Sequence, residues 1–181
     1  MTALLNSTID GIQSECFAVF SDDFGSDPSI FYAYMQWKEQ VSGIREAEKR
    51  NIAQCLVSLL AGSVTEGQHD IPQRRVDTPD AIKARLFSLG SYLLAKGKQT
   101  YFYYSTNSYY FTGPWYFPEW NINIGRPAND CDPIDACKLA NGLYQREFSN
   151  GMALVNPYDA NITMSMDLPA TFYEVILSGG N

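Results

Sequence analysis

Histidine and clustered metal ligands are almost absent from this sequence. The 181 residues include one histidine, His69, and four cysteines. The cysteines lack the paired spacing of a Cys/His zinc site, so we expect no zinc site and no other cofactor. No Gly-rich turn follows an apolar run in the way that phosphate-binding loops require, which makes a nucleotide-binding module the least favoured interpretation.

Basic runs and long apolar runs are also missing. Lys and Arg total 13 against 20 Asp and Glu, which gives a formal net charge of −7 without any cluster of basic residues. This balance argues against nucleic acid and anionic membrane surfaces as partners. No apolar stretch approaches the roughly 18 residues of a membrane span, and the first residues do not resemble a signal peptide.

The remaining composition is that of a globular protein. Hydrophobic residues make up 45% of the chain and charged residues 18%, so the chain is not disordered. Its length suits one ordinary domain or one and a half small ones. Aromatic residues reach 14% and are concentrated in one region.

Two features are typical of secreted proteins. Cys131 and Cys137 flank a short polar loop and could close it as a disulfide. Asn6 and Asn161 each begin a glycosylation sequon. We therefore expect an extracellular or secretory-pathway location.

Three apolar runs alternate with two helical patterns. The runs at residues 9–20, 52–60 and 100–105 are predicted strands. The helical patterns cover residues 27–50 and 78–97, and each opens with a capping residue followed by proline. The connections are long enough for parallel pairing, so the order predicts a βαβαβ unit of α/β class.

Apolar spacing predicts which side chains are buried in these elements. The first helix should bury Ile30, Tyr34, Trp37, Val41 and Ile44, and the second Ile82, Leu86, Leu89 and Leu93. A solvated face is expected at Glu46, Glu48, Lys49 and Arg50. Cys16 and Cys55 lie in apolar strands and are predicted to be buried thiols.

The last third of the chain changes to an antiparallel β pattern. Residues 107–125 are rich in aromatic residues, and no helix fits there. Residues 143–148 and 152–156 are predicted to form a hairpin around Ser149-Asn150-Gly151, because Asn-Gly favours positive φ. Two more short strands are predicted at residues 162–166 and 171–176.

A carboxylate, Glu15, lies in the middle of the first predicted strand. Burying a charge costs several kcal/mol unless a partner or a function compensates. One interpretation places Glu15 at the carboxyl end of a parallel strand, where α/β folds carry out chemistry. The alternatives are a Glu that pairs with an Arg and a Glu on an exposed strand face, and all three stay open.

Four stretches resemble a family of TIM-barrel glycoside hydrolases. The stretch Tyr144-Gln-Arg-Glu-Phe-Ser-Asn-Gly-Met-Ala-Leu-Val-Asn-Pro157 is similar to a hairpin signature near the C-terminus of that family. Leu93–Tyr104 resembles its last barrel helix and strand, and Trp115–Pro127 the loop that joins the barrel to a β domain. Ile9–Glu15 resembles a late barrel strand that bears a catalytic Glu.

The resemblance implies a partial (β/α)8-type barrel at residues 1–112, followed by an antiparallel β-sandwich-like domain at 113–181. A complete barrel takes about 250 residues, and only the last βα units match here. The chain is therefore either a fragment of a longer gene product or a stand-alone remnant. Glycosidases use two carboxylates about 5 to 9.5 Å apart, and the earlier strand that would supply the second is missing.

The resemblance also implies a substrate class and roles for individual residues. The substrate would be a poly- or oligosaccharide, and Glu15 would be the acid/base or nucleophile. Aromatic faces stack on sugar rings, so the implied substrate-binding set is Asp22, Tyr103, Tyr104, Tyr109, Trp115 and Trp120. For the two tryptophans, the alternative is that they join the barrel to the β domain.

Other polar residues near the strand ends have ordinary explanations. Asp10 is expected to cap or pair, and Asp23 to be solvated in a loop. Glu66 and His69 follow the second strand on the side of a site, where a single histidine is more often a bystander. Arg146 is expected to pair within the hairpin.

The alternative to an enzyme is a carbohydrate-binding or assembly remnant without turnover. An isolated βαβαβ sheet leaves strand edges and an apolar face exposed. Self-association, or pairing with a missing barrel half, is then expected.

Overall fold

The computed structural model describes residues 9–21, 31–60, 79–105, 116–158 and 160–165. Several predicted features lie outside these residues: Asn6, Asp22, Asp23, Asp27, Ile30, Glu66, His69, Tyr109, Trp115 and the strand at 171–176.

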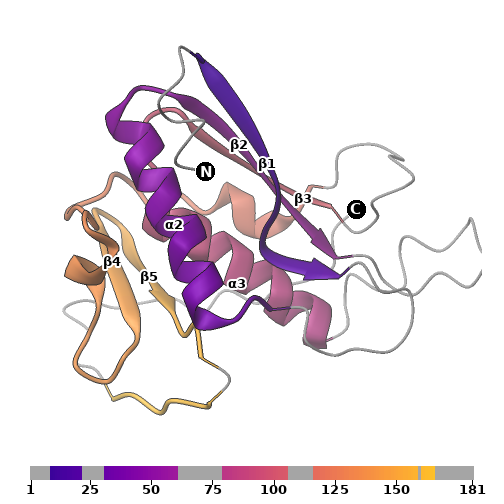
Figure 1. Ribbon diagram of the computed structural model, residues 1–181. Coiled ribbons are helices and arrows are strands. Elements are labelled where there is room, and N and C mark those ends of the chain that lie inside the picture. Colours follow the sequence, from indigo (N-terminus) through magenta and orange to yellow (C-terminus); the bar gives the residue numbers. More distant parts are fainter. Residues whose placement is uncertain (1–8, 22–30, 61–78, 106–115, 159, 166–181) are drawn as a thin grey trace, which may run out of the picture.

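A three-stranded parallel sheet forms the first layer. Strands β1 (Gly11–Ser21), β2 (Ala53–Leu60) and β3 (Thr100–Ser105) lie in the order β1-β2-β3 (Figure 1). Helices α2 (Tyr34–Lys49) and α3 (Pro79–Ala95) connect them. Parallel crossovers are almost always right-handed, so a sequential strand order places both helices on one face of the sheet. The predicted α/β class and its βαβαβ unit are confirmed.

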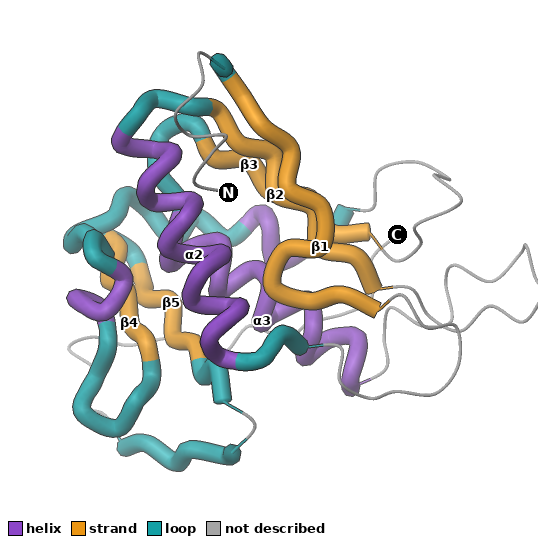
Figure 2. The backbone as a smooth tube through the Cα atoms, viewed as in Figure 1, coloured by secondary structure: helices purple, strands orange, loops and turns teal. Residues whose placement is uncertain are grey.

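The helices form a second layer and a hairpin forms a third. The hairpin consists of β4 (Tyr144–Phe148) and β5 (Gly151–Val155), which pair antiparallel as predicted. Figures 1 and 2 show the hairpin on the side of α2 and α3 that faces away from the parallel sheet, and α3 contacts both of its strands. Among the described elements, neither helix covers the opposite face of the sheet (Figure 1).

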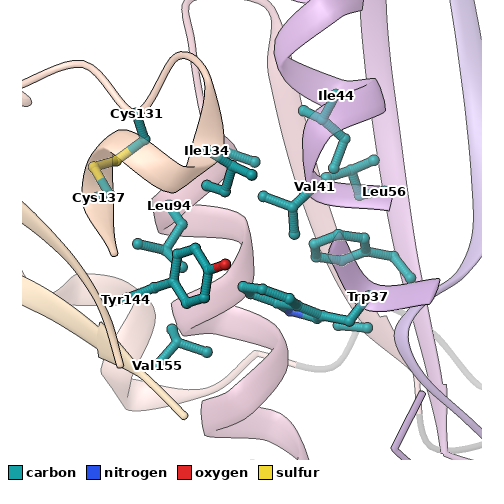
Figure 3. Packing of buried hydrophobic residues seen from close by; sticks show 13 residues of the cluster. Trp37, Val41, Ile44, Leu56, Leu94, Cys131, Ile134, Cys137, Tyr144 and Val155 are labelled. Carbon is teal, nitrogen blue, oxygen red and sulfur yellow. A yellow bond between two sulfur atoms is a disulfide. The ribbon is translucent and has the colours of Figure 1, made fainter. Parts of the chain in front are cut away.

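One hydrophobic core joins the helices to the sheet and to the hairpin. Trp37 is fully buried at its centre, with its indole N–H donating to Ser91 Oγ at 2.8 Å and its ring 5.0 Å from that of Tyr144 (Figure 3). The core continues from Leu56 of β2 to Val155 of β5. The proposed domain division after residue 112 stays a prediction.

Helix α2 begins later than the sequence predicts. Its N-cap is Ala33, and Phe31 instead forms an antiparallel bridge with Val19 while its ring lies 5.2 Å from that of Phe87. These contacts hold the chain extended before the helix, so the predicted start at residue 27 is wrong. The predicted burial of Trp37, Val41 and Ile44 is confirmed.

The buried face of α3 is not the predicted leucine stripe. Its buried residues are Ala84, Arg85, Ser88, Ser91, Leu94 and Ala95. Leu86 is 40% exposed, and it lines a hollow with Ile82 and Leu154. Four of the six buried residues are alanine or serine, and of the predicted stripe Leu86 is exposed while Ile82, Leu89 and Leu93 are half-buried.

Glu48 binds the backbone between α3 and β3 and is not solvated as predicted. Its carboxylate accepts hydrogen bonds from the backbone N–H groups of Lys98 and Gln99, each at 3.1 Å, and from the Thr100 hydroxyl. A Cβ on Gly97 would lie 2.2 Å from this carboxylate. Glycine at this position therefore makes room for the contact.

Arg146 caps α3, which corrects the predicted pairing within the hairpin. Its Nη1 donates to the carbonyl oxygens of Leu93, Leu94 and Lys96 at 2.7–3.0 Å. These carbonyls lie at the helix C-terminus, where they lack intrahelical partners. The arginine is 3% exposed, so the hairpin is attached to the helix through a buried charge.

The hairpin turn is held from outside the hairpin. Ser149 exchanges backbone and side-chain hydrogen bonds with Arg126, and the Asn150 N–H donates to the Ile124 carbonyl oxygen. The positive φ next to the turn belongs to Gly125, at +86°, whereas Asn150 and Gly151 do not have the predicted positive φ. Hydrogen bonds from residues 124–126 therefore hold this turn, in place of the positive φ angles that the Asn-Gly pair predicted.

Two other predictions for the last third of the chain are wrong. Residues 118–121 form a short 3₁₀ helix, η1 (Pro118–Asn121), where no helix was expected. Residues 161–165 are described without strand pairing, which contradicts the described part of the predicted 162–166 strand.

A disulfide joins Cys131 and Cys137, whose Cα atoms are 5.2 Å apart. It encloses most of a second 3₁₀ helix, η2 (Ile134–Cys137), and both half-cystines are buried against α2 and β4. The disulfide that the sequence allowed is therefore present.

Removing this disulfide should lower the stability of the chain. Closing a loop of this size lowers the conformational entropy of the unfolded state and raises its free energy by about 2 kcal/mol. We expect a Cys131→Ala/Cys137→Ala variant to lose about that much free energy of unfolding in urea titrations. Cys55→Ala, outside the loop, is the control; an equal loss in both variants would contradict the assignment.

Candidate functional site on the uncovered face of the sheet

The register of the parallel strands places Glu15 and Tyr103 in one row. Glu15 pairs with Val57, and Val57 pairs with Tyr103. Residues in register on neighbouring parallel strands project to the same face. Phe102 packs against Phe17 on the helix side, so the Glu15 row lies on the uncovered face.

A second row on the same face lies two residues earlier. It runs from Gln13 through Cys55 to Tyr101, which is 63% exposed. The Gln13 side-chain amide donates to Glu15 Oε1 at 3.1 Å and links the two rows. The face thus presents a carboxylate, an amide and two phenols, which are groups that hydrogen-bond to sugar hydroxyls and stack on sugar rings.

A β-bulge follows Glu15 directly. Pairing with β2 stops at Glu15 and resumes at Phe20, and Cys16 and Ala18 have φ of +64° and +62°. Bulges and left-handed non-glycine residues are strained and cluster beside functional sites. This bulge turns the chain into the core immediately after the carboxylate.

Polar side chains satisfy the backbone of the bulge. Gln40 of α2 accepts from the Ala18 N–H at 2.9 Å and donates to the Cys16 carbonyl oxygen at 3.3 Å. The Ser58 hydroxyl donates to the Phe17 carbonyl oxygen. The bulge is therefore a defined conformation held by α2 and β2.

Glu15 is exposed, which agrees with the alternative of a Glu on an exposed strand face and not with a buried strand. The physical reason is that β1 is an edge strand whose front face no described element covers. Neither of the two rows holds a second carboxylate. Cys16 and Cys55 are likewise half-buried rather than buried.

Tyr104 and Trp120 lie on the opposite, helix-covered side. Tyr104 is 1% exposed, and its ring lies 5.8 Å from that of Phe117. The Trp120 ring lies 5.2 Å from Phe117 and 6.4 Å from Phe102. Contact of Tyr104 and Trp120 with substrate stays a prediction, and their positions on the helix-covered side do not favour it. The contacts of Trp120 agree with the alternative, a packing role.

A buried ion pair joins this aromatic cluster to α3. Arg85 donates to Glu119 of η1, with side chains 0% and 1% exposed. The Arg85 guanidinium also lies 4.2 Å from the centre of the Phe117 ring. No described residue bonds the second oxygen of Glu119, the Tyr104 hydroxyl or the Trp120 indole N–H.

The burial of Tyr104 predicts a loss of stability at alkaline pH. Burial raises the pKa of its phenol well above the usual 10.0, because the charged form would be desolvated. The neutral form therefore stabilises the fold fully below pH 10, and this contribution falls as the pH rises above that value. We expect the absorbance of ionised tyrosine to lag behind that of free tyrosine above this pH. The late component should be smaller in Tyr104→Phe but not absent, because burial also raises the pKa of Tyr92 and Tyr144.

The described part of the chain shows neither a candidate metal cluster nor a helix suited to a membrane. No group of three or more His, Cys, Asp or Glu residues there could hold a metal ion. Among the same residues, neither helix is long and apolar enough to cross a membrane.

Comparison with known families decides the relationship. The model of hypothetical glycosyl hydrolase family 15 matches residues 3–152. The chain belongs to this family. The match includes all three parallel strands, both helices and β4, and it establishes a relation to glycoside hydrolases. No curated protein matches the chain.

Sequence reasoning found some residues of this face and missed others. In this member of hypothetical glycosyl hydrolase family 15, Glu15 and Tyr103 were identified and share a row, while Gln13 and Tyr101 were not singled out. Alternation along the strands was the available signal, because residues i−2 from Glu15 and Tyr103 must share their face. Asp22, Tyr109 and Trp115 lie outside the described residues.

Proposed function

We propose that this chain is the C-terminal part of a glycoside hydrolase that cleaves O-glycosidic bonds of a poly- or oligosaccharide, with Glu15 as one catalytic carboxylate. The family match supports the reaction class. The observation that carries the site is the row of Glu15 and Tyr103 on the uncovered face, with the strained bulge directly after the carboxylate.

The proposed setting is the last part of a (β/α)8-type barrel. Sequential parallel strands with both helices on one side are the repeat of such a barrel, whose inner face is the one without helices. Glu15 would then point into the barrel near a strand that pairs with the free edge of β1. That strand would supply the second carboxylate that glycosidases need.

A glycan panel tests the proposal directly. The chain is incubated with poly- and oligosaccharides, and newly formed reducing ends are measured together with binding. Turnover that depends on Glu15 supports a catalytic chain, as argued in the Discussion. Binding without turnover supports the second candidate below. The absence of both binding and turnover would contradict the assignment of this face to carbohydrate.

A carbohydrate-binding or assembly module without turnover is the second candidate. It is favoured by the open sheet: in the described chain, the outer edges of β1 and β3 have no strand partner, and Tyr101 is 63% exposed. Unpaired edges promote association. This candidate expects concentration-dependent dimers or larger species in sedimentation; a monomer at all concentrations counts against assembly.

We also propose an extracellular or secretory-pathway location. The Cys131–Cys137 disulfide supports it, because disulfides persist in oxidising compartments. Glycosylation at Asn161 in a secreting host, detected by mass, would agree with this proposal.

A further inference from the structure

The alternation of side chains along β1 is broken directly after Glu15. In a regular strand, residues two positions apart project to the same face, so Phe17 would lie beside Glu15 on the uncovered face. The structure instead places the Phe17 ring on the helix side, where it is 2% exposed and lies 6.4 Å from the ring of Phe102. The side chain that would adjoin the carboxylate is thereby removed from its face.

The β-bulge causes this reversal. Five steps along β1, from Glu15 to Phe20, correspond to only two steps along β2, from Val57 to Leu59. Extra residues in one strand interrupt the alternation and bend the chain. Figure 2 shows this part of β1 as a wide loop at the end of the strand. The direction of the Phe17 ring therefore depends on the bulge.

One side chain of α2 holds both residues of the bulge that have positive φ. Cys16 and Ala18 adopt this conformation, which is strained for residues other than glycine and persists only where the surroundings impose it. The Gln40 amide accepts from the Ala18 N–H at 2.9 Å and donates to the Cys16 carbonyl oxygen at 3.3 Å. Ser58 contacts only the carbonyl oxygen of Phe17, between the two strained residues. Gln40 is thus the side chain that spans the bulge.

We propose that Gln40 is a positioning residue that holds the bulge and thereby keeps the Phe17 ring off the face that carries Glu15. Without this amide, regular pairing with β2 competes with the bulge, and alternation returns the ring to the position beside the carboxylate. Substrate then binds only the fraction of molecules that retain the bulge. The inference rests on the proposed function, because that function makes the Glu15 face the substrate site.

Replacing Gln40 with methionine tests this role in the folded chain. Methionine has a similar length but offers the backbone neither the donor nor the acceptor of the amide. We expect KM for a cleaved glycan to rise about tenfold at nearly unchanged kcat, because substrate selects the molecules that retain the bulge. Gln36→Met, at an exposed position of α2, is the matched control and should change neither constant. An unchanged KM in Gln40→Met would overturn the proposal.

A glycine in the bulge provides the rescue. Glycine adopts positive φ without strain, so Ala18→Gly favours the bulge. In the variant Gln40→Met/Ala18→Gly we expect KM to return toward the native value. A KM that stays as high as in Gln40→Met would contradict a role that acts through the bulge.

NMR contacts of the Phe17 ring decide the positioning role without any turnover. Nuclear Overhauser contacts should join the rings of Phe17 and Phe102 in the native chain. In Gln40→Met we expect a second set of Phe17 signals with contacts to the Val57 methyl groups, which lie in the Glu15 row. A single set with native contacts in the folded variant would refute the positioning role, even if the native chain cleaves glycans.

The two proposals fail in different ways. A native chain that neither cleaves nor binds glycans, in which Gln40→Met still moves the Phe17 ring, contradicts the proposed function and supports the positioning role. If Gln40→Met does not fold, Gln40→Glu replaces it in the same measurements. An ionised glutamate still accepts from the Ala18 N–H but cannot donate to the Cys16 carbonyl oxygen, so the same changes are expected.

Discussion

Replacing Glu119 with alanine is expected to lower the free energy of unfolding by about 3–5 kcal/mol, because it removes the carboxylate that forms a buried ion pair with Arg85. The Arg85 side chain is fully buried, and Glu119 is the carboxylate with which it pairs. Urea unfolding followed by tryptophan fluorescence measures the loss as a lower midpoint at unchanged slope.

The matched control makes the same change in an exposed pair. Glu46 pairs with Arg50 one turn along α2, with side chains 40% and 39% exposed. Surface pairs contribute little, so Glu46→Ala should scarcely change the midpoint. Equal losses in the Glu119 and Glu46 variants would contradict the role of the buried pair.

A double variant separates the lost attraction between the two side chains from the cost of keeping the Arg85 charge buried without Glu119. Arg85→Met/Glu119→Met removes both charges and fills the space with flexible apolar side chains. Replacing both members of a buried pair is often neutral, so this variant should recover much of the loss. The comparison matters for the site because the pair fastens η1, which follows β3 in the chain, onto α3.

The regular elements could be predicted because their signals are local. Apolar runs gave the positions of β1, β2 and β3 to within one or two residues, and turn residues located the hairpin between β4 and β5. The start of α2 was wrong because a contact between Phe31 and Val19, twelve positions apart in the sequence, overrides a local capping signal.

The main errors concern polar side chains with distant partners. Arg146 caps carbonyls about fifty residues earlier in the chain, and Glu48 binds backbone about fifty residues later. No local pattern in a single sequence indicates such partners. Gly97 is a sequence feature that goes with one of these contacts, because its lack of a Cβ leaves room for the Glu48 carboxylate.

The candidate site was predictable only in part for a related reason. Strand alternation assigns residues to a face, but register alone shows that Glu15 and Tyr103 share a row. Tyr104 follows Tyr103 directly and therefore faces the helices, where it is buried. The bulge after Glu15 has no signature in the residues Cys-Phe-Ala-Val that form it.

Replacing Glu15 with glutamine is expected to lower kcat on a cleaved glycan by about 10²–10⁴-fold, the usual contribution of a positioned acid or base. Folding should be unaffected, because the side chain is exposed and its one described hydrogen bond, from Gln13 at 3.1 Å, can also be accepted by an amide oxygen. Stability should stay within about 0.5 kcal/mol of the native chain.

Glu39→Gln is the matched control for this variant. Glu39 is an exposed carboxylate on α2, remote from the uncovered face of the sheet, and its replacement changes net charge equally. Its kcat should equal that of the native chain. Full activity in Glu15→Gln would remove Glu15 from the mechanism, and an equal loss in both variants would indicate a general effect of charge.

The pH dependence of kcat then separates the two roles that a carboxylate can have. A general acid must be protonated, so its loss should abolish the fall in rate on the alkaline side of the profile. A nucleophile or base must be ionised, so its loss should abolish the fall on the acidic side. The described part of this face holds one carboxylate, so any pH dependence of kcat that remains in Glu15→Gln comes from the second carboxylate. A remaining fall on the alkaline side would identify that second group as the general acid, and a remaining fall on the acidic side as the nucleophile or base.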